Sequence, residues 1–450
     1  MTGSKTKPLR SRRKGKLSGH ITVPGDKSIS HRSLMLGAIA AGDTVIEGLL
    51  ESEDVHATAR AMAAFGARIE RHRNGRWTVA GLGEKGLQQP SLAIDFGNAG
   101  TGVRLAIGLM STTAIRAEFT GDASLTKRPM GRIIQPLEKM GTRFDASEGN
   151  RLPAIVRGAV HPSAITYELP VASAQIKSAI LLAALNTPGA TTVVEPVPTR
   201  DHTERMLRAF GGAPEISTGE DGARFITING PVKLEGQNVA VPADPSSAAF
   251  PIVAALITDG SEITLPGVMM NDTRSGLIGV LREMGADISI ENERPAGGET
   301  VADLTVHSSE LHGIKVSPDV APSMIDEYPV LAVAAACANG VTEMHGLEEL
   351  RVKESDRLSA IAEGLAANGV KVETGDDWLK VYGTGSAPDG GGTVATHLDH
   401  RIAMAFLVLG LATESPVTVD DGDTIATSFP DFVGLMERAG AAIEEVEPAA

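Results

Sequence analysis

One pattern recurs six times along the chain and constrains its fold more than any other feature: a helical segment, a turn of small residues with a glycine, and a short strand. The copies recur roughly every 75 residues, so six of them account for all 450 residues. Glycine after a helix readily adopts the left-handed conformation that ends it. The helix-ending glycines are Gly66, Gly141, Gly211, Gly285, Gly369 and Gly440. The pattern predicts an α/β protein built from six similar units.

A second element recurs with nearly the same period. It is an apolar strand after a turn, such as Gly260–Thr264, and a helix rich in small residues precedes it, such as Pro251–Ile257. Each unit therefore reads strand–helix–strand–helix–strand–strand. The period is longer than that of most solenoid repeats, so we expect compact groups of units rather than an open array.

An echo within the sequence divides the six units into two groups of three. Val23-Pro-Gly-Asp-Lys-Ser28 returns as Val241-Pro-Ala-Asp-Pro-Ser246, and both segments open a helix after a strand. The expected lobes are residues 1–24 with 243–450, and residues 25–242. The strand near His20–Val23 would pair with the last three units, and the chain would cross between lobes near Pro24 and Pro242. The cleft between the lobes is the expected place of an active site.

Composition excludes several functional classes. The formal net charge is −15 and aromatic residues make up 3% of the chain, which argues against nucleic acid as a partner. The single cysteine, Cys337, excludes an internal disulfide and any cysteine-cluster metal site, and it fits a reducing, cytoplasmic compartment. The longest apolar runs, such as Leu331–Ala338, are far short of the roughly 20 residues of a membrane span. We expect no membrane partner.

The first sixteen residues break the acidic trend. They contain no acidic residue and no apolar stretch of the kind that a secretory signal requires. The basic residues of this segment are Lys5, Lys7, Arg10, Arg12, Arg13, Lys14 and Lys16. We expect a solvated, partly disordered extension.

Positions where the copies differ are candidates for chemistry. Lys27, Ser28 and Arg32 stand at a predicted helix start, where the echo carries Pro245, Ser246 and Phe250. Backbone amides at a helix N-terminus and two cations form an anion site. The same residues also fit a serine N-cap with exposed basic neighbours, so this segment alone leaves both readings open.

A glycine-rich loop follows at Asp95–Arg104, with glycines that let the backbone approach a phosphate closely. Its spacing fits neither a P-loop nor a dinucleotide fingerprint. In the second half, Ser323–Pro329 holds two acids and Arg351–Arg357 packs five charges into seven residues. The pair His397 and His400 lacks a third ligand of fitting spacing, so no metal is expected.

Cations gather at these motif positions although the chain is acidic, and they come from both halves. They are Lys27, Arg32, Arg104, Arg128, Arg200, Lys353, Arg357 and Arg401. This implies substrates with several negative charges, bound between two lobes. Asp326 and Glu354 stand among the cations as candidates for general acid–base catalysis.

These motifs, in order and over almost the entire chain, resemble the 5-enolpyruvylshikimate-3-phosphate synthase family, in its divergent class II bacterial branch. They span residues 24–32, 97–104, 121–130, 173–177, 326–329, 351–357 and 399–404. The resemblance implies an inside-out α/β barrel with two lobes of three βαβαββ units. It also implies a transferase without a cofactor that moves the enolpyruvyl group of phosphoenolpyruvate to the 5-hydroxyl of shikimate 3-phosphate. Phosphate leaves through a tetrahedral intermediate, on the pathway to chorismate and the aromatic amino acids, and we expect a monomer.

The resemblance assigns roles to residues whose motifs match. The residues implied for phosphoenolpyruvate are Lys27, Gly100 through its backbone, Arg128, Arg357 and Arg401. Those implied for shikimate 3-phosphate are Ser28, Arg32, Ser173, Ala174, Gln175, Arg200, Asp326 and Lys353. The implied catalytic residues are Lys27, Asp326 and Glu354. Asp326 would take the proton of the 5-hydroxyl, and Glu354 would handle the proton at the methylene carbon.

The chain departs from the family at Thr427, where many members carry a lysine. The resemblance also implies a target of glyphosate, which occupies the phosphoenolpyruvate pocket, and an alanine at the position of Gly100 is associated with tolerance. Two alternatives remain. The sister enzyme that acts on UDP-N-acetylglucosamine usually needs a cysteine in the loop matching Asp122–Arg128, which has none here. A non-catalytic anion-binding scaffold would be favoured if either acid of the pair Asp326 and Glu354 were missing.

Overall fold

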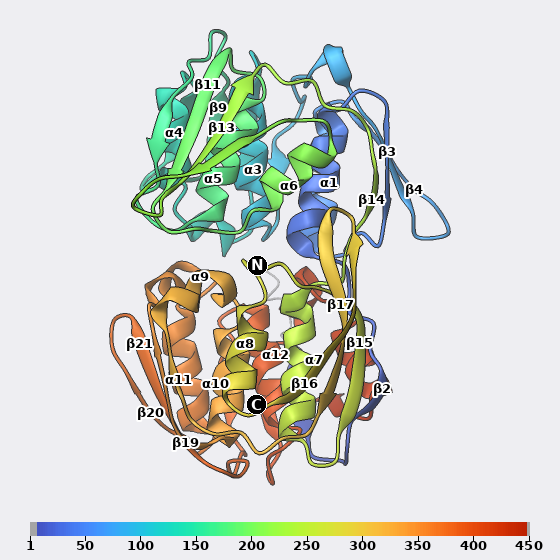
Figure 1. Cartoon of the computed structure of the whole chain (residues 1–450), viewed down its shortest axis with the longest axis vertical. Coiled ribbons are helices and arrows are strands. Elements are labelled where there is room, and N and C mark those ends of the chain that lie inside the picture. Colours follow the sequence, from blue (N-terminus) through green and yellow to red (C-terminus); the bar gives the residue numbers. More distant parts are fainter. Residues whose placement is uncertain (1–6, 448–450) are drawn as a thin grey trace. The chain divides into compact units, whose positions relative to one another are not determined.

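The computed structural model describes residues 7–447, and the chain falls into two compact units. Unit 1 takes the N-terminal segment up to Pro24, Pro242–Pro295 and the chain from Glu299 onward, and unit 2 takes Gly25–Val241 with Ala296–Gly298. Residues 7–447 form 13 α-helices and 24 β-strands, and Figure 1 shows their arrangement within each unit. Each unit contains three four-stranded sheets.

Unit 2 holds six helices and the strands from β3 to β14. The helices are α1 (Lys27–Ile39), α2 (Glu53–Ala64), α3 (Gly100–Met110), α4 (Gly131–Lys139), α5 (Ala174–Ala184) and α6 (His202–Ala209). The strands are β3 (Asp43–Glu47), β4 (Arg68–Arg71), β5 (Trp77–Ala80), β6 (Ile94–Asp95), β7 (Arg116–Thr120), β8 (Arg143–Ser147), β9 (Arg151–Arg157), β10 (Thr166–Glu168), β11 (Gly189–Glu195), β12 (Glu215–Thr218), β13 (Arg224–Gly230) and β14 (Asn238–Ala240). The sheets have the orders β14-β3-β5-β4, β6-β7-β9-β8 and β10-β11-β13-β12.

Unit 1 repeats this plan with the rest of the chain. The helices are α7 (Pro245–Ile257), α8 (Gly276–Glu283), α9 (Ala321–Met324), α10 (Tyr328–Cys337), α11 (Arg357–Ala367), α12 (His400–Leu409) and α13 (Phe432–Arg438). The strands are β1 (Leu9–Arg12), β2 (Ser18–His20), β15 (Glu262–Met269), β16 (Asp287–Ala296), β17 (Glu299–His307), β18 (Lys315–Val316), β19 (Asn339–His345), β20 (Lys371–Thr374), β21 (Trp378–Thr384), β22 (Thr393–Val394), β23 (Val417–Val419) and β24 (Ala442–Glu445). The sheets have the orders β16-β17-β15-β2, β18-β19-β21-β20 and β22-β23-β1-β24.

Each of the six sheets contains one parallel pair of strands, and one strand of that pair also pairs antiparallel with a third strand. In four sheets the parallel strands follow one another in the chain with a helical segment between them, as β6 and β7 do, and β7 then pairs antiparallel with β9. A parallel pair needs a crossover, and α3 supplies it here. The predicted order of strand–helix–strand–helix–strand–strand and the predicted α/β fold of six units are therefore confirmed.

Three sheets contain a strand from a distant part of the chain. The parallel partner of β3 is β14, about 190 residues later in the chain, and the parallel partner of β15 is β2 from the N-terminal segment. Strand β1 lies between β23 and β24 and pairs antiparallel with both. Segments far apart in sequence thus complete sheets in both units.

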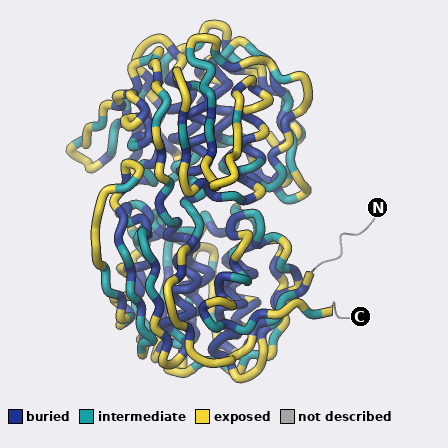
Figure 2. The backbone as a smooth tube through the Cα atoms, turned by 90° about the vertical axis from the view of Figure 1, so that its right-hand side faces the viewer, coloured by how far each residue is buried: buried dark blue, intermediate teal, exposed yellow. Residues whose placement is uncertain are grey.

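Three helices form the centre of each unit. In unit 1, α7, α10 and α12 pack against one another (Figure 1), and nearly all of their residues are buried. In unit 2, α3 packs against α1 and α5. Helices α7 and α10 are apolar on nearly all sides and rich in alanine, which suits burial all round. Figure 2 shows the same division along the backbone, with buried segments inside each unit and exposed residues in the outer turns.

All six glycines that were predicted to end helices adopt the left-handed conformation, with φ from +84° at Gly369 to +111° at Gly440. Another residue type would strain the backbone there, because a Cβ atom disfavours positive φ. The spacing of these glycines therefore corresponds to the length of the helix–turn–strand repeat.

The expectation of a solvated, partly disordered N-terminal extension is wrong for residues 9–12, whereas residues 13–16 are exposed and outside any strand. Residues 9–12 form β1 inside a sheet, with Ser11 fully buried and Arg12 exposed. The alternation of apolar or small residues with arginines fits a strand with one buried face, and the density of positive charge hides that signal. Lys5 lies outside the described residues.

Within residues 7–447, no single helix is long and apolar enough to cross a membrane; the bent pair Pro318–Met324 and Tyr328–Cys337 passes that test only when the two helices are joined.

Candidate active site

The first turn of α1 carries the first group of predicted site residues. The side chain of Asp26 caps the helix by accepting a hydrogen bond from the Ile29 amide at 2.7 Å. Lys27 follows at the first helical position and forms an ion pair with Asp54, whose side chain is 5% exposed. The cap fixes where the helix begins and thereby fixes the direction of Lys27 and Ser28.

Arg32, one turn further along α1, is held by three segments of unit 2. Its Nε donates to Thr203 Oγ1 at 2.8 Å, its Nη2 to Ser178 Oγ at 2.8 Å and its Nη1 to the Ser28 carbonyl at 3.0 Å. The residue is 3% exposed. The alternative of a serine N-cap with exposed basic neighbours is therefore wrong, because Asp26 caps the helix and Arg32 is buried.

His31 lies between these cations, fully buried, with its Nδ1 2.7 Å from Thr58 Oγ1. Burial, and after it the positive charges of Lys27 and Arg32, hold the pKa of His31 well below its ordinary value of 6.5. The imidazole is therefore neutral in the folded protein at neutral pH.

This burial predicts a pH dependence of stability. The unfolded chain binds a proton at His31 with the ordinary pKa, whereas the folded chain does not, so the folded state loses stability as pH falls below about 6.5, by up to about 1.4 kcal/mol per pH unit. In His31→Gln this contribution is absent. Urea unfolding of both proteins at several pH values should show a shallower acid-side decline for the variant; parallel curves would contradict the assignment.

The glycine-rich loop begins α3 at Gly100 and brings two arginines beside it. Arg128, at the end of a 3₁₀ turn, donates to Asn98 Oδ1 and to Ser124 Oγ, the latter at 3.1 Å. Asn98 in turn donates to Asp122 at 2.8 Å. Asp122 also accepts hydrogen bonds from two backbone amides of its own turn, at 2.9 and 2.7 Å. The loop therefore fixes Arg128, which is 7% exposed.

The start of α5 meets this loop. Ser173 is the N-cap residue, Ala174 begins the helix, and Gln175 donates to Thr101 Oγ1 at 2.9 Å. Arg104 donates through its Nη1 to Gln175 Oε1 at 3.1 Å and to the Gly100 carbonyl at 3.3 Å. Gln175 and the glycine-rich loop thus form one polar cluster.

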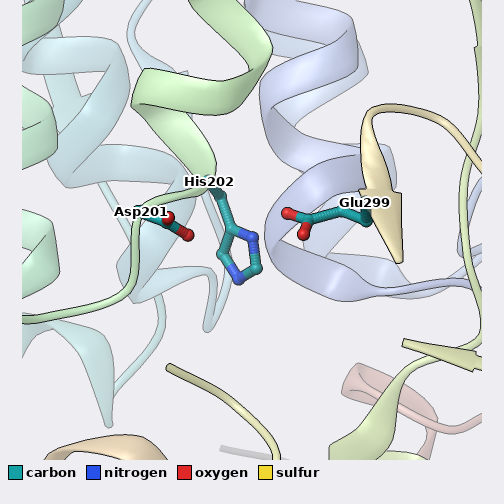
Figure 3. A group of neighbouring side chains, drawn as sticks. All are labelled: Asp201, His202 and Glu299. Atoms are coloured by element: carbon teal, nitrogen blue, oxygen red, sulfur yellow. The ribbon is translucent and has the colours of Figure 1, made fainter. Parts of the chain in front are cut away.

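Arg200 precedes α6 and belongs to the same unit. Figure 3 shows its neighbours Asp201 and His202 at the start of that helix, and on β17 of unit 1 it shows Glu299. Asp201 accepts a hydrogen bond from Arg205 Nε at 2.9 Å. Glu299 accepts one from Asn271 Nδ2 at 3.0 Å within unit 1.

In unit 1, Arg357 is the centre of a second cluster. The guanidinium is 1% exposed and lies among three carboxylates. Its Nε donates to Asp399 Oδ2 at 2.8 Å, its Nη1 to Asp326 Oδ1 at 2.9 Å and its Nη2 to Glu354 Oε2. Burial alone would lower the pKa of Arg357, but Asp399, Glu354 and Asp326 together raise it above the ordinary value. Both candidate acid–base residues are therefore fixed by one permanent cation.

Two further cations border this cluster. Lys353 Nζ lies 3.2 Å from the same oxygen of Asp326. Arg401 donates through Nη1 to the Asp326 carbonyl at 3.1 Å and to Glu327 Oε1 at 3.4 Å. Asp399 caps α12 by accepting from the Arg401 amide at 2.9 Å. The starts of α11 and α12 and the joint between α9 and α10 thus meet at one point.

Thr427, where the resemblance implied a lysine, lies beside another residue of α12. Its Oγ1 is 3.3 Å from His400 Nδ1 and donates to the Thr424 carbonyl at 2.7 Å. The threonine is therefore part of the local hydrogen bonding around the start of α12.

Each unit brings its own candidate residues together, and each adds residues that the sequence reasoning did not select. In unit 2 these are Asp54 beside Lys27 and Asp122 behind Arg128. In unit 1 it is Asp399 beside Arg357. Asp54 and Asp399 come from segments distant from the cations they contact, whereas Asp122 lies six residues before Arg128 in the same motif.

A comparison with known proteins supports one family. A model of the EPSP synthase (3-phosphoshikimate 1-carboxyvinyltransferase) family matches residues 11–436. A protein of Chelativorans sp. (strain BNC1), a 3-phosphoshikimate 1-carboxyvinyltransferase, is 60% identical over 442 residues, which cover 98% of both chains.

Solved structures agree. EPSP synthase from Acinetobacter baumannii is 46% identical, with a TM-score of 0.86, and the match covers 98% of this chain and 100% of that one. The enolpyruvyl transferase NikO from Streptomyces tendae, at 18% identity and a TM-score of 0.77, matches over 98% of this chain and 99% of that one and shares the fold. The inside-out α/β barrel that the sequence motifs implied is thereby confirmed.

Proposed function

Because the chain belongs to the EPSP synthase family, we propose which of its residues bind the two substrates of that family and which move protons. The activity of the family is the transfer of an enolpyruvyl group from phosphoenolpyruvate to the 5-hydroxyl of shikimate 3-phosphate, with release of phosphate. This chain is a transferase of the shikimate pathway.

Phosphoenolpyruvate is bound by Lys27, Arg128, Arg357, Arg401 and the Gly100 backbone. Arginine suits carboxylate and phosphate groups because its planar guanidinium donates two parallel hydrogen bonds. Arg401 supports this role: its recorded contacts, to the Asp326 carbonyl and Glu327, both use Nη1. Its Nε and Nη2 donors are therefore available to an anion as far as residues 7–447 are concerned. Arg357 contributes differently, because four of its five N–H donors already meet carboxylates.

Shikimate 3-phosphate is bound mainly by hydroxyl, amide and cationic groups. The residues that we assign to it are Ser28, Arg32, Ser173, Ala174, Gln175, Arg200, Asp326 and Lys353. Support comes from the polar cluster of Gln175 at the start of α5 and from the pair of Lys353 and Asp326. One phosphoenolpyruvate molecule is assigned residues of both units, so we propose that both units serve one reaction, in a monomeric cytoplasmic enzyme.

The chemistry follows from the two carboxylates on Arg357. Asp326 takes the proton of the 5-hydroxyl while the hydroxyl oxygen bonds to C2 of phosphoenolpyruvate. Glu354 delivers a proton to C3, which becomes a methyl group. Glu354, now a carboxylate, takes a proton back from that methyl group, and the C2–O bond to phosphate breaks. Lys27 stabilises the departing phosphate with its positive charge. Proton transfer by positioned side chains contributes about 10² to 10⁴-fold in rate.

The observation that carries this proposal is the joint hold of Asp326 and Glu354 by Arg357. A phosphate-release assay with phosphoenolpyruvate tests it, using shikimate 3-phosphate in one arm and UDP-N-acetylglucosamine in the other. Release with shikimate 3-phosphate alone is expected. Release with the UDP-sugar would support the sister activity, and release with neither would support a binding scaffold.

Gly100 offers a test of the phosphoenolpyruvate site. A Cβ atom at this position would lie 2.8 Å from Arg128 Nη1 and 3.0 Å from Arg104 Nη1, so Gly100→Ala must displace the head of Arg128. We expect the inhibitor glyphosate, which is longer than the cosubstrate, to lose at least about tenfold in affinity, because discrimination by one methyl group is worth about 1–3 kcal/mol.

Inhibition constants against phosphoenolpyruvate for both proteins measure this difference. Gly279→Ala is the matched control, because a Cβ atom there meets no other atom within 4 Å. Equal constants for the wild type and Gly100→Ala would show that this glycine does not control the fit.

A further inference from the structure

A fully buried group of three charges lies beneath the start of α5. Lys177 Nζ is 3.0 Å from Glu195 Oε1 at the end of β11 and 2.8 Å from Glu204 Oε1 on α6. The side chains of Lys177 and Glu195 are 0% exposed and that of Glu204 is 1% exposed. Thr199 donates to Glu195 through its hydroxyl, and its carbonyl lies 3.4 Å from Lys177 Nζ. We call Lys177, Glu195 and Glu204 the buried triad.

Stability does not explain the buried triad well. Removing two charges from water costs several kcal/mol each, and well-packed apolar residues often replace a buried ion pair without loss. The triad holds two carboxylates for one lysine, and burial raises the pKa of Glu195 in spite of the opposing effect of Lys177. Because burying these charges costs free energy that the ion pairs do not clearly return, we expect the triad to position a functional residue.

The residues next to Lys177 and Glu204 in the sequence contact Arg32. Ser178 follows Lys177 on α5, and Thr203 precedes Glu204 on α6; their hydroxyl oxygens are 2.7 Å apart. Both hydroxyls accept a hydrogen bond from Arg32, at 2.8 Å each. Helices α5 and α6 are thus joined twice, once through Lys177 and once through the two hydroxyls that hold the Arg32 guanidinium.

We infer that Lys177 is a positioning residue for shikimate 3-phosphate: with Glu195 and Glu204 it sets α6 against α5, and so fixes the two hydroxyls that aim Arg32. The inference rests on the proposed function, which assigns Arg32, Ser173, Gln175 and Arg200 to this substrate. Ser173 and Gln175 lie at the start of α5 and Arg200 in the segment before α6, the two helices that the triad connects. Arg32 lies on α1 and is held by hydroxyls of both helices.

The inference predicts a selective effect. The loop of Gly100 and Arg128, assigned to phosphoenolpyruvate, lies at the start of α3 and in the turn before α4. Within residues 7–447 the side-chain ion pairs and hydrogen bonds of the triad join its members to one another and to Thr199, and not to that loop. In Lys177→Met, shikimate 3-phosphate should therefore bind at least about tenfold more weakly, as expected when one charge-assisted hydrogen bond is misplaced. The KM for phosphoenolpyruvate and kcat at saturating shikimate 3-phosphate should change by less than about threefold.

Calorimetric titration of shikimate 3-phosphate and steady-state kinetics measure both effects. Val156→Ala is the matched control: this fully buried residue of β9 loses packing in the same unit, so its stability falls without a change in either constant. Because Lys177→Met leaves two buried carboxylates and can prevent folding, the nearly isosteric Glu204→Gln is measured in parallel. It should weaken the same binding in the same selective way.

A folded variant with wild-type affinity for shikimate 3-phosphate, or one that loses both substrates equally, would overturn the inference. If Lys177→Met does not fold, Glu204→Gln alone decides. Failure of the proposed function is distinguishable, because in that case the wild type itself would release no phosphate from phosphoenolpyruvate with shikimate 3-phosphate.

Discussion

Replacing Glu354 with glutamine is expected to lower kcat by about 10² to 10⁴-fold, while the KM of each substrate changes far less. The amide is nearly isosteric, and its oxygen can still accept the hydrogen bond that Arg357 donates to Glu354. The variant therefore keeps the geometry of the cluster and loses only the capacity to exchange a proton. Initial rates of phosphate release over a grid of both substrate concentrations separate kcat from the two KM values.

Glu348→Gln is the control for this experiment, since Glu348 is an exposed residue of the 3₁₀ turn just before the cluster. It should turn over like the wild type. Near-normal turnover of Glu354→Gln would remove Glu354 from the mechanism, and a rise in KM without a fall in kcat would make it a binding residue.

The second large effect is expected on stability. In Arg357→Met, three carboxylates lose the cation that they share, and the side chain that is replaced is 1% exposed. Breaking a buried ion pair by removal of one partner costs about 3–5 kcal/mol, so the free energy of unfolding of unit 1 should fall by about that amount, and activity should be lost.

Arg357→Lys keeps the charge but not the planar fork that reaches three carboxylates at once. Its loss of stability should be smaller than that of Arg357→Met. Urea unfolding of the three proteins measures the difference. If Arg357→Met were as stable as the wild type, the carboxylates would not depend on this arginine.

The repeat was readable from the sequence because its signals are local. A helix that ends in a left-handed glycine is specified by a few adjacent residues, and all six such glycines have the expected conformation. The sequence did not predict every strand that a distant segment contributes to a sheet. Strand β1 has four residues with two arginines, and its place between β23 and β24 depends on hydrogen bonds to segments more than 400 residues away.

The candidate site was also predictable only in part. Cations were found in the sequence because each stands in a local motif at a helix start. Their acidic partners were missed, because Asp54 and Asp399 come from segments that only the fold brings to Lys27 and Arg357. The motif of Arg357 indicates an anion site, but it does not show that most of its N–H donors bind carboxylates of the chain itself.

The central claim is that protons are added to and removed from the methylene carbon by Glu354 while Asp326 takes the hydroxyl proton. Catalysis in D₂O, followed by NMR of the vinyl group, tests it most directly. With both substrates, the account predicts that the wild type places deuterium in the vinyl group of the product and of recovered phosphoenolpyruvate, and that Glu354→Gln places almost none. Release of phosphate by the wild type without any deuterium in the vinyl group would contradict the addition–elimination mechanism.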